Sequence, residues 1–113
     1  MSEAENICVS EDLGGYVLVR VCGEVDLSWS QQVRDAILAA LGRCDGVGVE
    51  LAQVTYIDSS GIAALVEGFQ TARGQGRRFG LIAASRQVLA VLQLARLDKV
   101  FPLFADLDAA RDA

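Results

Sequence analysis

Histidine is absent from this chain, and basic residues, cysteine and proline are scarce. Without histidine, neither a Ser-His-Asp triad nor a zinc site with the usual histidine ligands is possible. The 15 acidic residues outnumber the 10 basic residues and give a net charge of −5 at pH 7, which repels a nucleic-acid backbone. We therefore expect no metal, no cofactor and no direct binding to nucleic acid.

The three cysteines, Cys8, Cys22 and Cys44, do not have the spacing of a metal site. An odd number of cysteines without a signal peptide is typical of a reducing compartment. Long hydrophobic runs are also missing, and none approaches the roughly 20 residues of a membrane span. We therefore expect a cytoplasmic protein that does not insert into a membrane.

Nine of the ten basic residues are arginines, and their one cluster is Arg73, Arg77 and Arg78. Cations are favourable at the C-terminus of a helix, where the backbone dipole is negative. We interpret the cluster as such a C-terminus, and an anion-binding patch is the alternative interpretation.

Hydrophobic residues make up 52% of the 113 residues, which is enough for the core of one domain over residues 1–113. Periodicity and turn residues predict the elements in order. The first elements are strands at 7–10 and 16–22, a helix capped by Ser28 with Gln31, and a strand at 47–51 that leads through Val54, Tyr56 and Ile57. A helix then places Ile62, Leu65, Val66 and Phe69 on one face and runs to Gly74 or Gly76. A strand at 79–83, a helix capped by Ser85, a short strand at Val100 and Phe101, and a helix capped by Asp106 complete the order.

This order predicts an α/β fold. After an N-terminal antiparallel hairpin, helices alternate with strands, so right-handed crossovers should make the remaining strands parallel. We expect a mixed, mostly parallel sheet of four to five strands packed against about four helices. In such sheets, functional groups gather at the carboxyl ends of the strands.

The segment Asp58-Ser59-Ser60-Gly61 lies at such an end, between a strand and an amphipathic helix. Lys99 is the one lysine available as a base for a serine nucleophile, and the segment lacks the glycines and lysine of a phosphate-binding loop. We therefore expect no enzymatic activity and no catalytic residues. Two interpretations remain: Asp58 or Ser59 is an N-cap with Gly61 relieving crowding, or a hydroxyl accepts phosphate at the positive end of a helix.

Three stretches resemble the STAS-domain anti-sigma factor antagonists. They are Asp58 to Gly61 after an apolar strand end, Gly23-Glu24-Val25-Asp26 after a central strand, and Leu94 to Phe101 near the C-terminus. The resemblance covers nearly the whole chain, roughly residues 6–110, and implies a single STAS domain with its core over that range. It also implies a regulator of transcription that acts by partner switching.

In that mechanism the unphosphorylated antagonist binds an anti-sigma factor, which is also a serine kinase of the histidine-kinase-like ATPase type. The kinase phosphorylates the antagonist and releases it, and a serine phosphatase resets it. The resemblance implies that Ser59 is the phosphorylated residue, with Ser60 as a minor alternative. Asp26, Asp58, Ser60 and Gly61 are then expected at the partner-binding surface, where Asp58 and Gly61 shape the loop.

A second resemblance leaves an alternative function open. Residues 61–70 also resemble small STAS proteins that accompany lipid-transporting ABC permeases. In such proteins the domain braces a membrane complex without regulating a sigma factor, and the hydroxyl can be a contact rather than a phosphorylation site.

Overall fold

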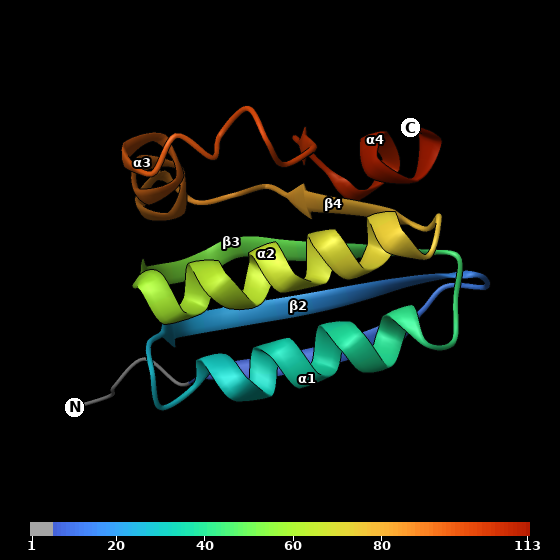
Figure 1. Ribbon diagram of the computed structural model, residues 1–113, viewed down its shortest axis with the longest axis horizontal. Helices are drawn as coiled ribbons and strands as arrows, with labels where there is room; N and C mark the ends of the chain where they lie inside the picture. The colour runs from blue at the N-terminus through green and yellow to red at the C-terminus, as the bar shows by residue number, and fades with distance from the viewer. Residues whose placement is uncertain (1–5) are drawn as a thin grey trace.

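The computed structural model describes residues 6–113, which form five strands and four helices (Figure 1). The elements are β1 (Ile7–Asp12), β2 (Tyr16–Val25), α1 (Ser30–Leu41), β3 (Gly46–Ile57), α2 (Ser59–Gly74), β4 (Arg78–Ile82), α3 (Arg86–Leu94), β5 (Leu103–Phe104) and α4 (Leu107–Asp112). Within this part of the chain, no helix is both long and apolar enough to cross a lipid bilayer.

The strands form one sheet in the order β1-β2-β3-β4-β5. β1 and β2 are antiparallel, and the pairs β2–β3, β3–β4 and β4–β5 are parallel. This mixed, mostly parallel sheet with an N-terminal hairpin confirms the predicted fold class. Because β2 and β3 are parallel neighbours, their carboxyl ends lie together at one edge of the sheet.

The two faces of the sheet are covered unequally. Alternate residues of β2, including Val17, Val19 and Val21, are buried in the main core with residues of α1, α2 and α3. The opposite face has a smaller cluster in which Tyr16 and Leu18 pack with residues of β4 and α4. Farther along β2 on that second face, Arg20 is exposed and pairs with Glu50, so α4 covers only part of it.

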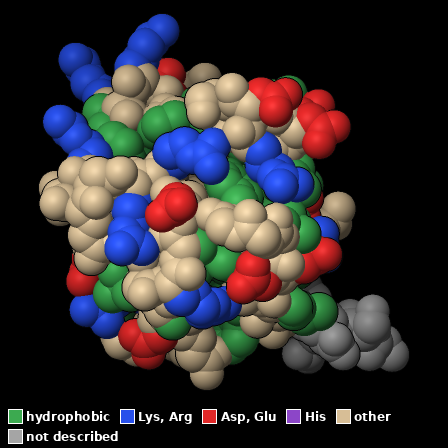
Figure 2. Space-filling view, turned by 90° about the vertical axis from the view of Figure 1, so that its right-hand side faces the viewer, with side chains coloured by type: hydrophobic (Ala, Val, Ile, Leu, Met, Phe, Trp, Pro, Cys, Tyr) green, Lys and Arg blue, Asp and Glu red, His purple; other side chains and the backbone are tan. Residues whose placement is uncertain are grey.

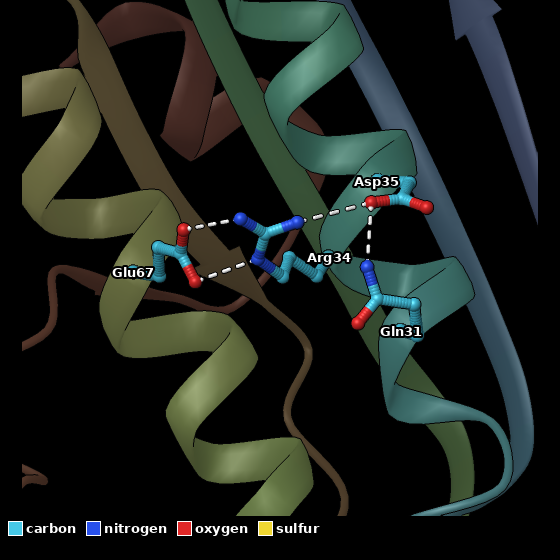
Figure 3. A network of polar contacts seen from close by, with 4 residues as sticks. All are labelled: Gln31, Arg34, Asp35 and Glu67. Atoms are coloured by element: carbon cyan, nitrogen blue, oxygen red, sulfur yellow. Dashed lines mark hydrogen bonds and ion pairs between the residues drawn. The ribbon is translucent and has the colours of Figure 1, made fainter.

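Helices α1 and α2 lie side by side in front of the sheet (Figure 1). Gly68 is buried where they meet, and a methyl group there would come within 2.6 Å of Ile37 Cγ2 on α1. On the solvent side, Arg34 of α1 donates to both carboxylate oxygens of Glu67 on α2, at 2.7 and 2.8 Å (Figure 3). A close backbone approach and a two-pronged ion pair therefore fix the two helices relative to each other.

Two local predictions were wrong. Residues Val100 and Phe101 do not form a strand, because their N–H groups donate to the Leu97 carbonyl in a turn. The last strand instead follows Pro102 as β5. Ser28 does not cap α1: the residue before the helix is Trp29, without a side-chain cap, because the Ser28 hydroxyl donates to Asp26.

Candidate functional site

The loops after β2 and β3 lie next to each other at the carboxyl edge of the sheet. Val25 pairs with Ile57 as the last register position of the two strands. Immediately beyond it, the Asp58 N–H donates to the Val25 carbonyl oxygen at 3.2 Å. The two segments that sequence analysis singled out, 23–26 and 58–61, are thus joined in one site at the N-terminus of α2.

Asp58 is the N-cap of α2. Its backbone is extended, and its Oδ1 accepts hydrogen bonds from the N–H groups of Ser60 and Gly61 at 2.9 and 3.2 Å. The same oxygen accepts the Ser60 hydroxyl at 2.6 Å. That hydroxyl, followed by the N–H groups of Gly61, Ser60 and Leu27, lowers the pKa of Asp58 below its ordinary value. Of the two N-cap candidates, Asp58 and Ser59, the cap is therefore Asp58, and its carboxylate is held ionised.

The two serines of the motif have different environments. Ser60 is half-buried, and its hydroxyl is engaged by Asp58. Ser59 is the first residue of α2 and is exposed, and within residues 6–113 its hydroxyl has no hydrogen-bond partner. The motif therefore presents one free hydroxyl to solvent, at the end of a helix where the dipole is positive.

Gly61 is buried beneath this hydroxyl. A Cβ atom there would come within 2.6 Å of Ile57 Cγ1 and 2.8 Å of the Val25 carbonyl oxygen. Because a backbone oxygen cannot move aside as a flexible side chain can, glycine is required for α2 to start this close to β2 and β3. Gly61 thus shapes the loop without contributing to its surface.

Asp26 organises the neighbouring loop in a similar way. Its Oδ1 accepts the N–H of Ser28 at 3.0 Å and the Ser28 hydroxyl at 2.6 Å, and its backbone carbonyl accepts the N–H groups of Trp29 and Ser30. This loop presents Leu27, a residue that is 79% exposed. Leu27 was not among the residues predicted for the site, although an apolar residue between Asp26 and Ser28 in a polar loop is a signal for it.

The site consists of accessible groups on two loops whose shape is held by hydrogen bonds. Its two carboxylates are both occupied by hydrogen bonds that hold their own loops. Among residues 6–113, no group of three or more histidine, cysteine or acidic side chains gathers to hold a metal ion. What the arrangement offers is an exposed hydroxyl and an exposed leucine, Leu27, on two rigid adjoining loops.

Comparison with known structures finds the same architecture in other proteins. The chain is 28% identical to an anti-sigma factor antagonist from Mycobacterium paratuberculosis, with a TM-score of 0.85 over 96% of this chain and 92% of that one. A putative anti-sigma factor antagonist from Thermotoga maritima is 18% identical, with a TM-score of 0.84 over 93% and 92% of the two chains. The phosphorylated Bacillus cell fate determinant SpoIIAA is 22% identical, with a TM-score of 0.74 over 94% and 97%.

A family model described as "Mlab, STAS domain" matches residues 11–105. That range contains both loops of the site and nearly all of the sheet. It agrees with the family that the three sequence stretches resemble. The chain therefore belongs to the STAS domain family.

Proposed function

We propose that this STAS domain is an anti-sigma factor antagonist that acts by partner switching, as a binding module and not as an enzyme. With Ser59 unmodified, it binds an anti-sigma factor that is also a serine kinase of the histidine-kinase-like ATPase type. Phosphorylation of Ser59 releases it, and a serine phosphatase restores it. The similarity to the mycobacterial antagonist over almost the whole of both chains supports this role.

The observation that carries the proposal is the difference between the two serines. A kinase needs a hydroxyl that can enter its active site, and Ser59 is exposed at the start of α2 with a free hydroxyl. Phosphorylation of Ser60 would first have to break its 2.6 Å hydrogen bond to Asp58 and expose a half-buried side chain. Ser59 is therefore the better acceptor.

The same geometry gives a physical mechanism for release. A phosphate adds about −1.5 to −2 charges and would lie next to the Asp58 carboxylate, on a chain that is already acidic. A partner surface that accepts an uncharged hydroxyl would then face like-charge repulsion or the desolvation of a dianion. A loss of about 1.4 kcal/mol is sufficient for a tenfold weaker complex.

The remaining residues of the site either contact the partner or hold the shape of the loops. The Asp26 loop and Leu27 supply the contact surface beside Ser59, since both are accessible from solvent. Asp58, Ser60 and Gly61 hold the shape of that surface through the cap and the close approach to Val25. Substitutions in this second group should weaken partner binding by altering the loop.

Phosphorylation with the cognate kinase and ATP tests the acceptor. We expect mass spectrometry to find one added phosphate on the wild-type protein and on Ser60→Ala, and none on Ser59→Ala. Circular dichroism controls for the fold of each variant. Labelling of Ser59→Ala to the wild-type level would disprove the assignment.

Capture of partners from the native cell tests the wider role. An anti-sigma factor with an ATPase domain, retained by the wild-type protein and lost on phosphorylation, is the expected result. Retention of an ABC permease and its ATPase instead, independent of Ser59, would replace the proposed function with a role in lipid transport.

A further inference from the structure

A pocket of about 290 Å³ lies at the end of the molecule opposite Ser59. It opens between the C-terminal end of α2, the start of β4 and the segment around β5 and α4. Ser59 and Arg73 stand at the two ends of α2, about 21 Å apart along its axis. The pocket is therefore separate from the site described above.

The pocket has an aromatic interior and a cationic rim. Phe69, Phe79 and Phe104 line it, together with the three arginines of the cluster in the sequence, Arg73, Arg77 and Arg78. Figure 2 looks onto this end of the molecule and shows arginine and lysine side chains beside hydrophobic surface. The apolar lining favours an apolar ligand body, and the rim favours a negative charge.

The charges of these arginines are not neutralised by neighbouring carboxylates. Arg20 and Arg34 form ion pairs, whereas in the described part of the chain Arg73, Arg77 and Arg78 have no Asp or Glu side chain within ion-pair distance. The net charge of the chain is −5, so acidic residues are plentiful elsewhere. Three unpaired cations around one pocket in an acidic protein indicate complementarity to an anion.

The three arginines differ in what holds them. Arg77 donates through one nitrogen to the carbonyls of Leu41 and Cys44, both at 2.6 Å, and so ties the end of α1 to the pocket wall. One nitrogen of Arg78 donates to the Arg111 carbonyl at 2.9 Å and to the Ala113 oxygen at 3.5 Å, and its guanidinium lies 5.3 Å from the centre of the Tyr16 ring. Arg73 lies 5.8 Å from the Phe69 ring centre. Arg73 and Arg78 thus keep N–H donors for a ligand, and Arg77 is structural.

The C-terminus of α2 explains only part of this cluster. Arg73 lies in the last turn of the helix, as predicted. Arg77 and Arg78 lie beyond this helix, in the following loop and in β4, and Arg77 donates to the carbonyl of Leu41 at the C-terminus of α1 instead. The alternative interpretation of the cluster, an anion-binding patch, therefore applies to Arg73 and Arg78, which keep N–H donors for a ligand.

We propose that this pocket binds a small aromatic carboxylate, with its ring among Phe69, Phe79 and Phe104 and its carboxylate on Arg73 and Arg78. Aromatic rings pack favourably edge-to-face or offset against phenylalanine, and a guanidinium binds a carboxylate through charge-assisted hydrogen bonds. The volume lies just below that of pockets for drug-sized ligands, so the ligand is a compact one.

Titration of the ¹⁵N-labelled protein with naphthoate tests the proposal, with naphthylmethanol as a neutral ligand of the same shape. We expect saturable chemical-shift changes at residues around Phe69, Arg78 and Phe104, and binding of naphthoate that is at least about fivefold tighter than that of the alcohol. Equal affinities for the two compounds, or shift changes spread over other surfaces, would overturn the proposal.

Substitutions identify the residues responsible. Arg73→Gln and Arg78→Gln should each weaken naphthoate binding about fivefold, and the double variant more, without changing the affinity for the alcohol. Arg86→Gln is the matched control, because Arg86 is an exposed arginine at the start of α3, outside the pocket. The spectra of the free variants verify that each is folded. A double variant that binds naphthoate as well as the control does would refute the assignment.

Discussion

The Asp58 carboxylate illustrates how much the site depends on single residues. One of its oxygens accepts hydrogen bonds from two backbone N–H groups and one hydroxyl. This single atom therefore fixes the junction between β3 and α2. Its neighbour Gly61 permits the close approach that brings these donors into place. Ser59 is presented to solvent because the residues on either side of it are held.

At this scale we predict that Asp58→Ala lowers the free energy of unfolding by about 1 kcal/mol, because it removes an N-cap. Asp58→Asn should retain most of the stability, since asparagine caps helices as well as aspartate does. Urea denaturation at neutral pH measures both variants. Equal losses in the two would show that the charge, and not the cap, provides the stability.

The pH dependence follows from the lowered pKa of Asp58. Its pKa in the folded protein is below the ordinary value of 3.8, so the unfolded chain binds the proton more tightly. The stability that this provides is present above pH 3.8 and is lost as the pH falls through the folded pKa. Asp58→Asn should therefore lose less stability than the wild-type protein between about pH 5 and pH 2, measured by thermal unfolding.

At the scale of elements, the contact between α1 and α2 depends on Gly68. A methyl group there would meet Ile37 Cγ2 at 2.6 Å and Phe79 Cε1 at 3.1 Å. We predict that Gly68→Ala lowers the free energy of unfolding by about 1–3 kcal/mol through overpacking, as measured by urea denaturation. Gly74→Ala is the matched control on the same helix, because no atom lies within 4 Å of its added methyl group, and its stability should be unchanged or slightly higher.

The ion pair between Arg34 and Glu67 makes a smaller contribution to the same interface (Figure 3). Both side chains are partly exposed, and water screens such pairs. The Arg34 guanidinium lowers the pKa of Glu67 below its ordinary value of 4.5, so the contribution is lost as the pH falls below that value. We predict a smaller loss of thermal stability for Glu67→Gln than for Gly68→Ala. The reverse order would show that the ion pair dominates the contact.

The elements also show how far sequence reasoning reaches. The caps at Ser85 and Asp106 could be predicted from residue type, because a cap is a purely local interaction. In the structure each of these side chains accepts a hydrogen bond from the backbone N–H three residues ahead. The predictions of a cap at Ser28 and of a strand at Val100 were wrong because other partners take the groups concerned. The Asp26 carboxylate accepts the Ser28 hydroxyl, and the Leu97 carbonyl accepts the Val100 N–H. Local patterns do not reveal which of two available partners a group takes.

The candidate site, too, was predictable only where it depends on local sequence. Its position at the carboxyl end of β3 followed from the alternation of strands and helices, and the N-cap followed from the residue types. That Asp58 engages Ser60 and leaves Ser59 free was not predictable, because either hydroxyl can reach a preceding carboxylate. The exposure of Leu27 and the pocket beside Arg73 also required the folded chain, since both depend on elements distant in sequence.

At the scale of the whole molecule, α2 separates two surfaces of opposite charge. Its N-terminus presents Ser59 beside the carboxylates of Asp26 and Asp58, and its C-terminus presents Arg73 at the rim of the aromatic pocket. Near the middle of α2, Gly68 packs on Ile37 of α1 and Glu67 pairs with Arg34 of α1. A charge added at Ser59 therefore changes one surface and leaves the other intact.

This separation leads to a prediction for Ser59→Asp. A negative side chain at the first position of a helix is compatible with the dipole, so thermal stability should equal that of the wild-type protein or exceed it slightly. Affinity for the anti-sigma factor should nevertheless fall by at least about tenfold, because the added charge meets a surface complementary to a neutral hydroxyl. Calorimetric titration with the purified partner measures the loss.

Ser60→Asp separates the effect of charge from the effect of shape. It brings the same charge within one residue of Ser59, but it also removes the hydroxyl that donates to Asp58 and sets two carboxylates against each other. We expect this variant to lose both stability and affinity, whereas Ser59→Asp loses affinity alone. If Ser59→Asp binds the anti-sigma factor as tightly as the wild-type protein, charge at this position does not control the complex; if it unfolds, the exposed hydroxyl has a structural role that its environment does not indicate.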